Sequence, residues 1–406
     1  MNKKTIRIPA MLFLSGISST SFAAGFALIE QSVTGLGRAF AGSAAVSEDA
    51  SAQYFNPAAL SYLKREEMDL AINFIAPRSE FNNDGSTIPS NGGDYSDAAN
   101  NAFLPNFSYV KPLNEKLTLG FAVVSPFGLV TEYNESWVGR YSAVKSDLKT
   151  YNFNPSLAFK ATDKLSIGFG VSAQYIDLTL TQMARLAGSD VKVKLEADDW
   201  AYGYNMGVIY DFTPSTRVGL SYRSKISHTL EGDGSIRQVG VEDNITGDVD
   251  LPETLSLALQ QRLSQKWTVM ADVTWTRWSR FQELKIESDG GTLSSTKEEK
   301  WENTLRYGIG LSYAHSDKWQ FRTGIAYDET PVPSAQYRTA RIPDTDRTWL
   351  AVGATYHYSD NLILDAGYAH LFADNPKINE TTGSSRLSGD YDVNVDIVGV
   401  QLRWLH

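Results

Sequence analysis

Two stretches of the sequence alternate strictly between apolar residues and small or polar ones. In LSIGFGVSAQY, which begins at Leu165, apolar side chains occupy the odd positions as far as Tyr175. LRYGIGLSY, which begins at Leu305, repeats the pattern. Successive side chains of a β-strand point to opposite faces, so this alternation predicts strands with one apolar and one polar face. A soluble β-sandwich would show the same alternation as a β-barrel in a membrane, so the pattern alone does not distinguish these two folds.

Short polar turns recur between these strands. Six similar segments end one strand and begin the next, and each is separated from its neighbour by 43 to 53 residues. Each interval holds two strands of about ten residues and a much longer loop, as in outer-membrane barrels. If both termini lie in the periplasm, six periplasmic turns predict an all-β fold, a transmembrane 14-stranded antiparallel β-barrel. The cell outer membrane of a Gram-negative bacterium is the expected location, with membrane lipid around the wall.

The first 23 residues are typical of a signal peptide. Lys3, Lys4 and Arg7 precede a short apolar run, and Ser21 and Ala23 supply the small residues of a cleavage site. A membrane anchor is the alternative, but the apolar run is well short of the roughly 20 residues that a helical span needs. We therefore expect cleavage after Ala23.

Residues 24–65 differ from the strand-like remainder, 66–406. They are rich in small residues and show no sustained alternation. A barrel of about 14 strands is too wide for its own side chains to fill, so this segment is predicted to plug the lumen as a hatch. A mobile periplasmic tail is the alternative. Asn56, Pro57 and Ala58 favour an ordered segment, because Asn-Pro initiates a turn and proline can begin a helix.

Composition and motifs exclude several classes of function. The chain has no cysteine and a formal net charge of −10, so disulfides and nucleic-acid binding are not expected. It contains no G-x-S-x-G, P-loop or H-E-x-x-H motif, and we expect neither an enzyme nor a cofactor or metal site. A hydrolase whose Ser and His meet only in the folded chain remains the enzymatic alternative. A monomer is expected.

The sequence resembles a known family at several places. AGFALIEQSVTGLGRAFAG followed by NPAAL, and later YRSKISHTLEG, WSRFQELK and RIPDTDRTWLAVG, are similar to segments of the FadL-type outer-membrane transporters of long-chain fatty acids. The resemblance covers essentially the whole mature chain and implies a 14-stranded barrel with an N-terminal hatch. It departs from the family at the C-terminus, which ends in His406 where an aromatic residue is usual.

The resemblance also implies binding residues. Arg185 and Lys297 match positions that contact the bound carboxylate in fatty-acid members, and Phe26, Leu28 and Ile29 would supply apolar wall to the same pocket. The strand pattern changes from odd to even after Tyr175, at Ile176, Leu178 and Leu180, which predicts a bulge there that turns Arg185 inward. Counting back from Leu305 in unbroken register places Lys297 outward instead.

A gate and a contact point are also predicted. Pro126, Phe127 and Gly128 interrupt a strand that begins at Leu117. Proline removes a ladder donor and glycine permits a bend, so we expect a kink that opens the wall laterally. Gly207 is expected where the hatch approaches the inner wall closely.

The working hypothesis is passive uptake of long-chain fatty acids, with lateral exit through this third strand. Uptake of neutral aromatic or alkane hydrocarbons is the alternative within transporters, and a structural or adhesive barrel is the alternative of another class.

Overall fold

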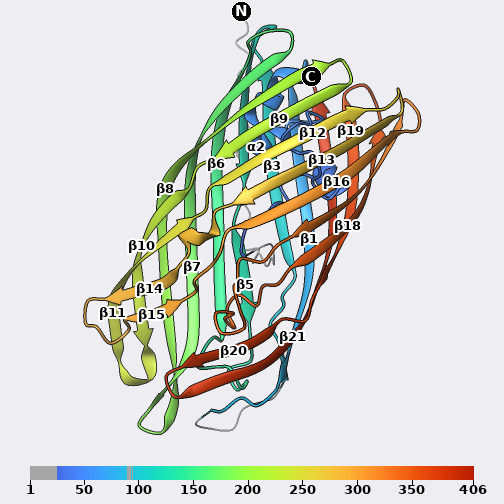
Figure 1. The fold of residues 1–406 in the computed structure, drawn as a ribbon. Helices are drawn as coiled ribbons and strands as arrows, with labels where there is room; N and C mark the ends of the chain where they lie inside the picture. Colours follow the sequence, from blue (N-terminus) through green and yellow to red (C-terminus); the bar gives the residue numbers. More distant parts are fainter. Residues whose placement is uncertain (1–24, 89–92, 94) are drawn as a thin grey trace, which may run out of the picture.

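The computed structural model describes residues 25–88, 93 and 95–406. The predicted signal peptide, residues 1–23, lies outside the described residues. The chain forms a closed antiparallel barrel of 14 strands around an internal N-terminal segment, as Figure 1 shows. The predicted fold class is therefore confirmed. In the part of the chain that is described, no helix is both long enough and apolar enough to cross a membrane.

Most strands of the wall are continuous. These are β1 (Glu67–Asn83), β3 (Ala102–Pro112), β6 (Lys145–Lys160), β7 (Leu165–Leu186), β8 (Ser189–Thr213), β17 (Trp319–Asp328), β18 (Arg347–His357), β19 (Leu362–Ala373) and β21 (Ser385–Leu405).

The remaining wall strands are each interrupted once. They are β4 (Leu117–Val124) with β5 (Gly128–Glu132), β9 (Thr216–Arg223) with β10 (Ile226–Ile236), β11 (Val241–Leu251) with β12 (Thr254–Arg262), β13 (Trp267–Thr276) with β14 (Glu283–Ser288), and β15 (Ser295–Glu298) with β16 (Thr304–Ala314). Two short strands, β2 (Tyr95–Asp97) and β20 (Lys377–Thr382), belong to loops at the end opposite the C-terminus (Figure 1).

The barrel closes between its first and last strands. β1 pairs with β21 in antiparallel register from Glu67↔Leu405 to Asn83↔Gly389. The six predicted turns all join strands at the rim where the C-terminus lies. There the Leu405 N–H donates to the Asn361 carbonyl at 2.9 Å. Turn count, strand count and connectivity agree with the sequence prediction.

The two faces of the strands meet different surroundings. Ile167, Phe169 and Val171 of β7 are 43%, 50% and 47% exposed on the outer surface, whereas Ser172 and Gln174 are buried inside. An apolar outer band with a polar interior is the arrangement that lipid requires of a barrel. The apolar face predicted from the alternation is thus the outside of the wall.

The bulge predicted near Tyr175 is absent. β7 pairs with β8 in unbroken register from Leu165↔Tyr210 to Leu186↔Ser189. The apolar residues change face because the interior becomes apolar at this level: Ile176 and Leu180 both lie in buried apolar clusters. The prediction failed because it assumed that apolar side chains of one strand share one face.

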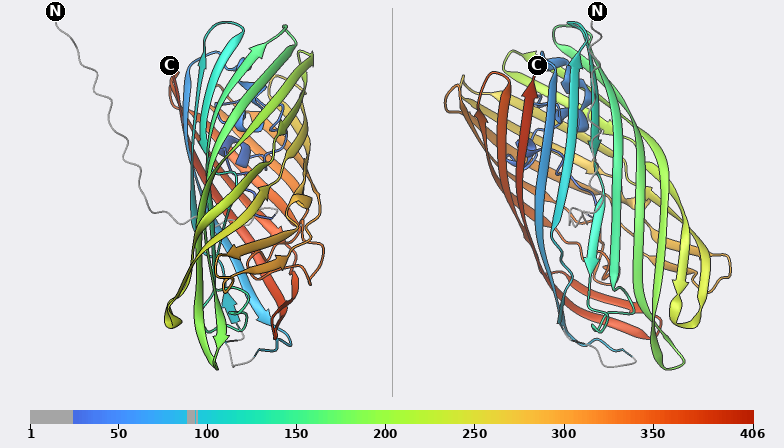
Figure 2. Two further views of the ribbon diagram at one scale, coloured as in Figure 1. Left: turned by 90° about the vertical axis from the view of Figure 1, so that its left-hand side faces the viewer. Right: turned by 180° about the vertical axis from the view of Figure 1, so that it is seen from behind.

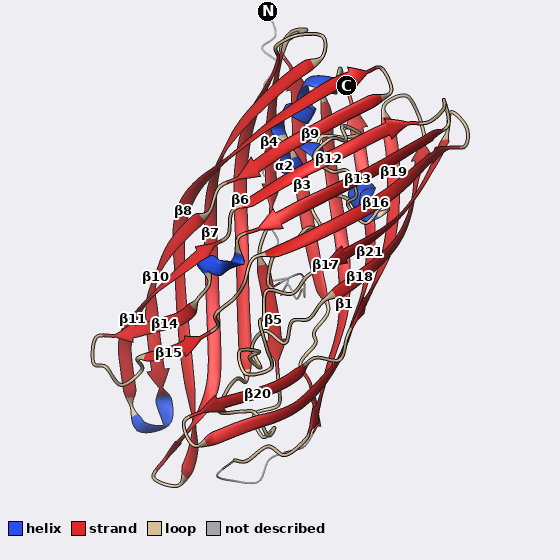
Figure 3. Cartoon of the chain, in the orientation of Figure 1, coloured by secondary structure: helices blue, strands red, loops and turns tan. Residues whose placement is uncertain are grey.

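The described part of the predicted hatch, residues 25–65 and called here the N-terminal segment, lies inside the barrel (Figures 2 and 3). It contains three short helices, α1 (Val33–Leu36), α2 (Ala52–Phe55) and the 3₁₀ helix η1 (Pro57–Tyr62). Two further 3₁₀ turns, η2 (Arg237–Val239) and η3 (Trp278–Arg280), belong to the wall connections. Glycines on inward-facing positions of the wall allow the segment to approach the strands at backbone distance.

Candidate functional site

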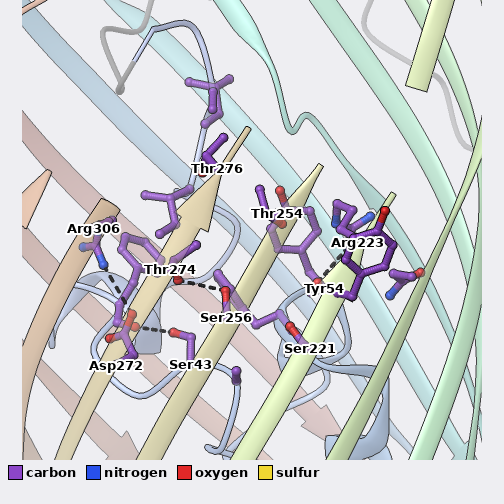
Figure 4. A pocket seen from close by; sticks show the side chains of 18 of the residues that line it. Ser43, Tyr54, Ser221, Arg223, Thr254, Ser256, Asp272, Thr274, Thr276 and Arg306 are labelled. Atoms are coloured by element: carbon purple, nitrogen blue, oxygen red, sulfur yellow. Dashed lines mark hydrogen bonds and ion pairs between the residues drawn. The ribbon is translucent and has the colours of Figure 1, made fainter. Parts of the chain in front are cut away.

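A cavity of about 130 Å³ lies between the N-terminal segment and the inner wall (Figure 4). One side is apolar and comes mostly from the N-terminal segment, with Ala27, Leu28, Ile29, Phe40 and Phe55. The opposite side is more polar and comes from β9, β12, β13 and β16, with Arg223, Thr254, Ser256, Asp272, Thr274 and Arg306. An apolar pocket with a few placed polar groups is the usual form of a small-molecule site.

The wall is interrupted beside this cavity. β4 ends at Val124 and β5 begins at Gly128. β3 pairs with β4 only from Phe107 to Pro112, and β5 pairs only with β6. In the described chain, residues 102–106 of β3 therefore have no strand partner on the side that faces β5. The kink predicted at Pro126, Phe127 and Gly128 is present, and it leaves the hydrogen-bond ladder of the wall incomplete.

The start of the N-terminal segment pairs with this strand break. The Leu28 N–H donates to the Pro126 carbonyl at 2.8 Å, and the Gly128 N–H donates to the Phe26 carbonyl at 2.9 Å. Gln31 Nε2 donates to the Ser125 carbonyl at 2.8 Å. The predicted wall residues and the predicted gate residues thus form a single structural unit.

Phe26 lies at the centre of an aromatic cluster. Its ring centroid is 5.0 Å from that of Trp278, 5.6 Å from Phe281, 5.7 Å from Trp301 and 6.0 Å from Phe127. Aromatic rings at these spacings contribute about 0.5–1.5 kcal/mol per pair beyond the area that they bury. The cluster holds the first described residues of the N-terminal segment against the strand break.

The polar wall carries two buried arginines. Arg306 Nη2 donates to the Ala39 carbonyl at 2.6 Å, while its Nη1 is 3.9 Å from Asp272 Oδ2 (Figure 4). Arg223 Nη2 donates to the Tyr54 carbonyl at 2.7 Å. Arg306 Nε and Nη1 and Arg223 Nη1 have no hydrogen-bond acceptor among the described residues. Buried guanidinium N–H groups at a cavity wall can receive a carboxylate.

The Asn56 region is held by the wall itself. Asn56 Nδ2 lies 2.6 Å from the Ala44 carbonyl and 3.3 Å from the Val208 carbonyl on β8, and Asn56 Oδ1 caps η1 by accepting the Ala58 N–H at 2.9 Å. A Cβ atom at Gly207 would fall 1.9 Å from Asn56 Oδ1. The close approach predicted at Gly207 is present, and its partner is the Asn-Pro turn.

The site residues implied by the family resemblance do not all meet. Arg185 lies next to the turn of the β7–β8 hairpin, where its Nη1 is 3.2 Å from Asp190 Oδ1, and it does not line the cavity. Without the expected bulge, its side chain is not turned into an apolar pocket. The structure gives no support to the predicted role of Arg185 in this cavity.

Lys297 faces inward, contrary to the register count from Leu305. The strand stops at Glu298, and Lys300 has a positive φ of 50° before β16 begins. Across this irregular segment the face changes, and Lys297 Nζ lies 3.0 Å from Glu380 Oε1. Lys297 therefore already has a carboxylate partner, away from the cavity.

Glu30 is a buried acid in the N-terminal segment. Its backbone carbonyl accepts Asn73 Nδ2 at 2.8 Å and Asn106 Nδ2 at 2.9 Å. Burial raises the pKa of the Glu30 carboxyl to about 7, although nearby Arg347 and Arg306 act in the opposite direction. The group therefore titrates close to neutral pH.

The model of the family described as outer membrane protein transport protein (OMPP1/FadL/TodX) matches residues 14–405. The chain belongs to this family. The long-chain fatty acid transport protein of Salmonella typhi is 31% identical over 416 residues, covering 94% of this chain and 95% of that protein. The 47 kDa outer membrane protein of Pasteurella multocida is 34% identical, with 88% and 89% covered.

A solved structure is similar over nearly the whole barrel. A Pseudomonas aeruginosa FadL homologue superposes with a TM-score of 0.89 at 25% identity, covering 94% of this chain and 99% of that one. The Ralstonia pickettii toluene transporter TbuX, at 19% identity and a TM-score of 0.67 over 94% and 99% of the two chains, shares the fold. This FadL-family protein is thus an outer-membrane transporter of hydrophobic molecules, and the members of its family are transporters or channels.

Several residues of the site in this FadL-family chain were not predicted from sequence. The interruption between β13 and β14 supplies Trp278 and Phe281, and the one between β15 and β16 supplies Trp301. Inward-facing strand positions supply Arg223 and Arg306. The alternation marks Arg306 as inward, since it opposes the apolar face of LRYGIGLSY. No local signal marked the tryptophans, because their contact with Phe26 joins segments more than 250 residues apart.

Proposed function

We propose that this FadL-family transporter takes up long-chain fatty acids. The observation that carries the proposal is the pairing of an apolar cavity with free guanidinium N–H groups of Arg223 and Arg306 at its wall. An alkyl chain favours the apolar side, and a carboxylate in such a place needs a cationic donor, because an unpaired buried charge is costly. The names of the Salmonella and related proteins, long-chain fatty acid transport proteins, support the same substrate class.

The substrate would leave sideways through the strand break into the membrane. Transferring a chain of about sixteen methylenes into water costs roughly 0.8 kcal/mol for each, so a route that avoids the periplasm is strongly favoured. The incomplete ladder between β3 and β5 supports this route, because the opening lies beside Leu28, which also lines the cavity.

The N-terminal segment would act as the hatch that closes the lumen between transport events. Its first residues bind the strand break through two backbone hydrogen bonds and the Phe26 aromatic cluster. A ligand tail that enters the cavity contacts Leu28 and Ile29, and would thereby release these contacts. Phe26 itself lies behind the cavity lining and would act by holding the strand break closed.

Binding of matched ligands tests the substrate class. The purified protein should bind a long-chain fatty acid more tightly than the alcohol or methyl ester of the same length, and Arg306→Gln should remove most of that difference. Trp267→Phe on the outer surface provides a control for general effects of substitution. Equal affinity for acid and ester in the unaltered protein would contradict the proposal.

Uptake of neutral hydrocarbons is the second candidate. The aromatic cluster around Phe26 favours it, since rings of this kind pack well against flat apolar molecules. In that case Arg306→Gln should leave binding unchanged for acid, ester and aromatic hydrocarbon alike. The same set of ligands therefore separates the two candidates.

A further inference from the structure

Glu30 is a buried titratable group that the proposed function leaves unused. It is 1% exposed, and its Oε2 atom has no hydrogen-bond partner among the described residues. Its backbone carbonyl accepts the uncharged side-chain amides of Asn73 on β1 and Asn106 on β3. Asn106 lies in the stretch of β3 that has no strand partner beside the strand break. Glu30 is therefore fixed at one edge of the lateral opening, with a carboxyl oxygen that no described residue binds.

The groups that face the Glu30 carboxyl belong largely to the cavity. Three strands of the wall supply Arg306 (β16), Asp328 (β17) and Arg347 (β18), whose charges act on Glu30. Within the N-terminal segment, the charge of Glu30 acts in turn on the Tyr54 hydroxyl of α2. Arg306, Asp328 and Tyr54 line the cavity. The Glu30 carboxyl is thus within electrostatic range of the place proposed for the head group of the substrate.

The charges that line the cavity already balance. Among the described residues they are two guanidinium groups, of Arg223 and Arg306, and two carboxyl groups, of Asp272 and Asp328. Arg347, which is not part of the lining, is paired with Asp344 at 2.9 Å. A substrate carboxylate adds one negative charge to this enclosed space, and an uncompensated buried charge is costly. A proton that is taken up together with the substrate removes the excess.

Lateral exit also requires a proton. A carboxyl group of ordinary pKa, about 4.3, is ionised in neutral water, so a fatty acid arrives as its carboxylate. An ionised carboxylate is strongly disfavoured in hydrocarbon, where no water or cation compensates its charge, whereas the neutral acid loses only hydrogen bonds. The substrate must therefore gain a proton after it enters the barrel and before it passes through the strand break.

We propose that Glu30 donates this proton, so that the fatty acid enters the membrane as the neutral acid. The O–H bond of the Glu30 carboxylic acid breaks, and an O–H bond forms on the substrate carboxylate. Glu30 is left as a carboxylate and later regains a proton from water. This transfer belongs to the lateral uptake of fatty acids proposed above and depends on it.

Burial and the arginines decide when the proton moves. Burial raises the pKa of Glu30 to about 7, so near neutral pH much of Glu30 is protonated before the substrate arrives. While Arg306 binds the substrate carboxylate, the charge of that carboxylate favours retention of the Glu30 proton. As the substrate leaves the arginines for the apolar opening, desolvation raises the pKa of its own carboxyl, and Arg306 becomes available to stabilise the Glu30 carboxylate. Both changes favour transfer from Glu30 to the substrate.

The first test measures the protons taken up on binding. Calorimetric titration in buffers that differ in ionisation enthalpy gives the number of protons bound with each ligand. At pH 8 most Glu30 is ionised before binding, so the fatty acid should bring in about one proton and its methyl ester none. At pH 6 Glu30 already carries its proton, and the uptake should be about tenfold smaller. Glu30→Gln should bind the acid without proton uptake.

The second test measures uptake by cells. Glu30→Gln has no proton to donate, so fatty-acid uptake at pH 7 should fall about tenfold or more at unchanged surface abundance, although the purified variant still binds the acid. Uptake of the methyl ester, which needs no proton, should be unchanged. Glu48→Gln is the matched control, because Glu48 is an acid of the same segment that holds it to the wall through Arg322 at 3.1 Å. Loss of that contact should affect acid and ester alike.

Three results would overturn the proposal. One is binding of the acid by the unaltered protein at pH 8 without proton uptake, and another is undiminished proton uptake in Glu30→Gln, which would place the proton on another group. The third is fatty-acid uptake by Glu30→Gln that is unchanged, or reduced equally for acid and ester, since neither fits a proton donor. If this variant does not assemble, proton uptake by the unaltered protein decides. Equal binding of acid and ester by the unaltered protein would instead contradict the fatty-acid proposal itself, so the two failures can be told apart.

Discussion

The two ends of the N-terminal segment contact the wall in different ways. At the Asn-Pro turn the segment lies directly against the strand backbone. A Cβ atom on Gly168 of β7 would fall 2.2 Å from the Ala58 backbone nitrogen, and one on Gly207 of β8 would fall 1.9 Å from Asn56 Oδ1. At Phe26 and Leu28 the contact consists of aromatic and aliphatic side chains and two hydrogen bonds to an interrupted strand.

This difference indicates which end can move. A backbone contact cannot be relieved by a change of rotamer, and it forms an anchor. An apolar contact can be replaced by the apolar tail of a ligand at little cost, because one buried surface substitutes for another. We therefore expect the Asn56 region to stay in place while residues 26–31 exchange contacts during transport.

Gly207→Glu should have the largest effect, because it attacks the anchor. A side chain there collides with Asn56 and buries a charge without a partner, which costs several kcal/mol. We expect fatty-acid uptake by cells to fall by about 100-fold or more at unchanged surface abundance. Ser189→Glu, exposed at the start of β8, is the matched control. Normal uptake by Gly207→Glu would show that the anchor is dispensable.

Repair of the strand break should have the next largest effect. Replacing Pro126, Phe127 and Gly128 by Thr, Val and Thr restores a ladder donor and places a Cβ 2.9 Å from Leu28 Cδ1. Uptake should fall about tenfold or more, while binding to the purified protein persists, because lateral exit is blocked. Undiminished uptake in a correctly assembled variant would eliminate lateral exit at this position.

Asn56→Ala should weaken the anchor without blocking it. The variant loses the cap of η1 and the side-chain donor to Ala44, together worth about 2 kcal/mol. Limited proteolysis should cut the N-terminal segment faster than in the unaltered protein. Asn56→Asp keeps the cap acceptor and loses the donor, so an intermediate rate is expected; identical rates for the two variants would mean that only one of these interactions matters.

A change of pH should affect the Phe26 end. The pKa of Glu30 is raised from 4.5 to about 7, so the folded segment holds this proton more tightly than the unfolded one. Protonation of Glu30 therefore stabilises the folded segment relative to the unfolded one. This stabilisation is fully present below pH 4.5 and is lost as the pH rises through about 7. Hydrogen exchange in residues 26–31 should be slower at pH 5 than at pH 8. Glu30→Gln should remove most of this difference, and a full difference in that variant would assign it to another group.

Arg185→Glu should have the smallest effect. Its ion pair with Asp190 lies next to an exposed hairpin turn, away from both ends of the segment. Exposed pairs contribute little, so binding of fatty acid should be unchanged within error. A large and selective loss of fatty-acid binding would restore the role implied by the family resemblance and require Arg185 to reach the ligand in another conformation.

The sequence by itself determined the features that depend on neighbouring residues. Alternation of side chains is a property of each strand, and a polar turn is a property of four or five residues, so the strand number and the connectivity could be predicted. The kink at Pro126 followed from the chemistry of proline and glycine in the same way. The inward position of Gly207 also follows from its place on β8.

Only the tertiary structure decided which residues meet inside the barrel. Phe26 contacts Trp278 and Trp301 because two interruptions of distant strands direct these rings inward. The direction of a side chain depends on whether the strand is regular up to that residue. The bulge expected before Arg185 is absent, whereas a strand break that was not expected lies between Lys297 and Leu305. A single inserted residue reverses every following side chain, so such errors do not cancel along a strand. Which side chains line the site depends on these irregularities, and no local sequence pattern predicts them.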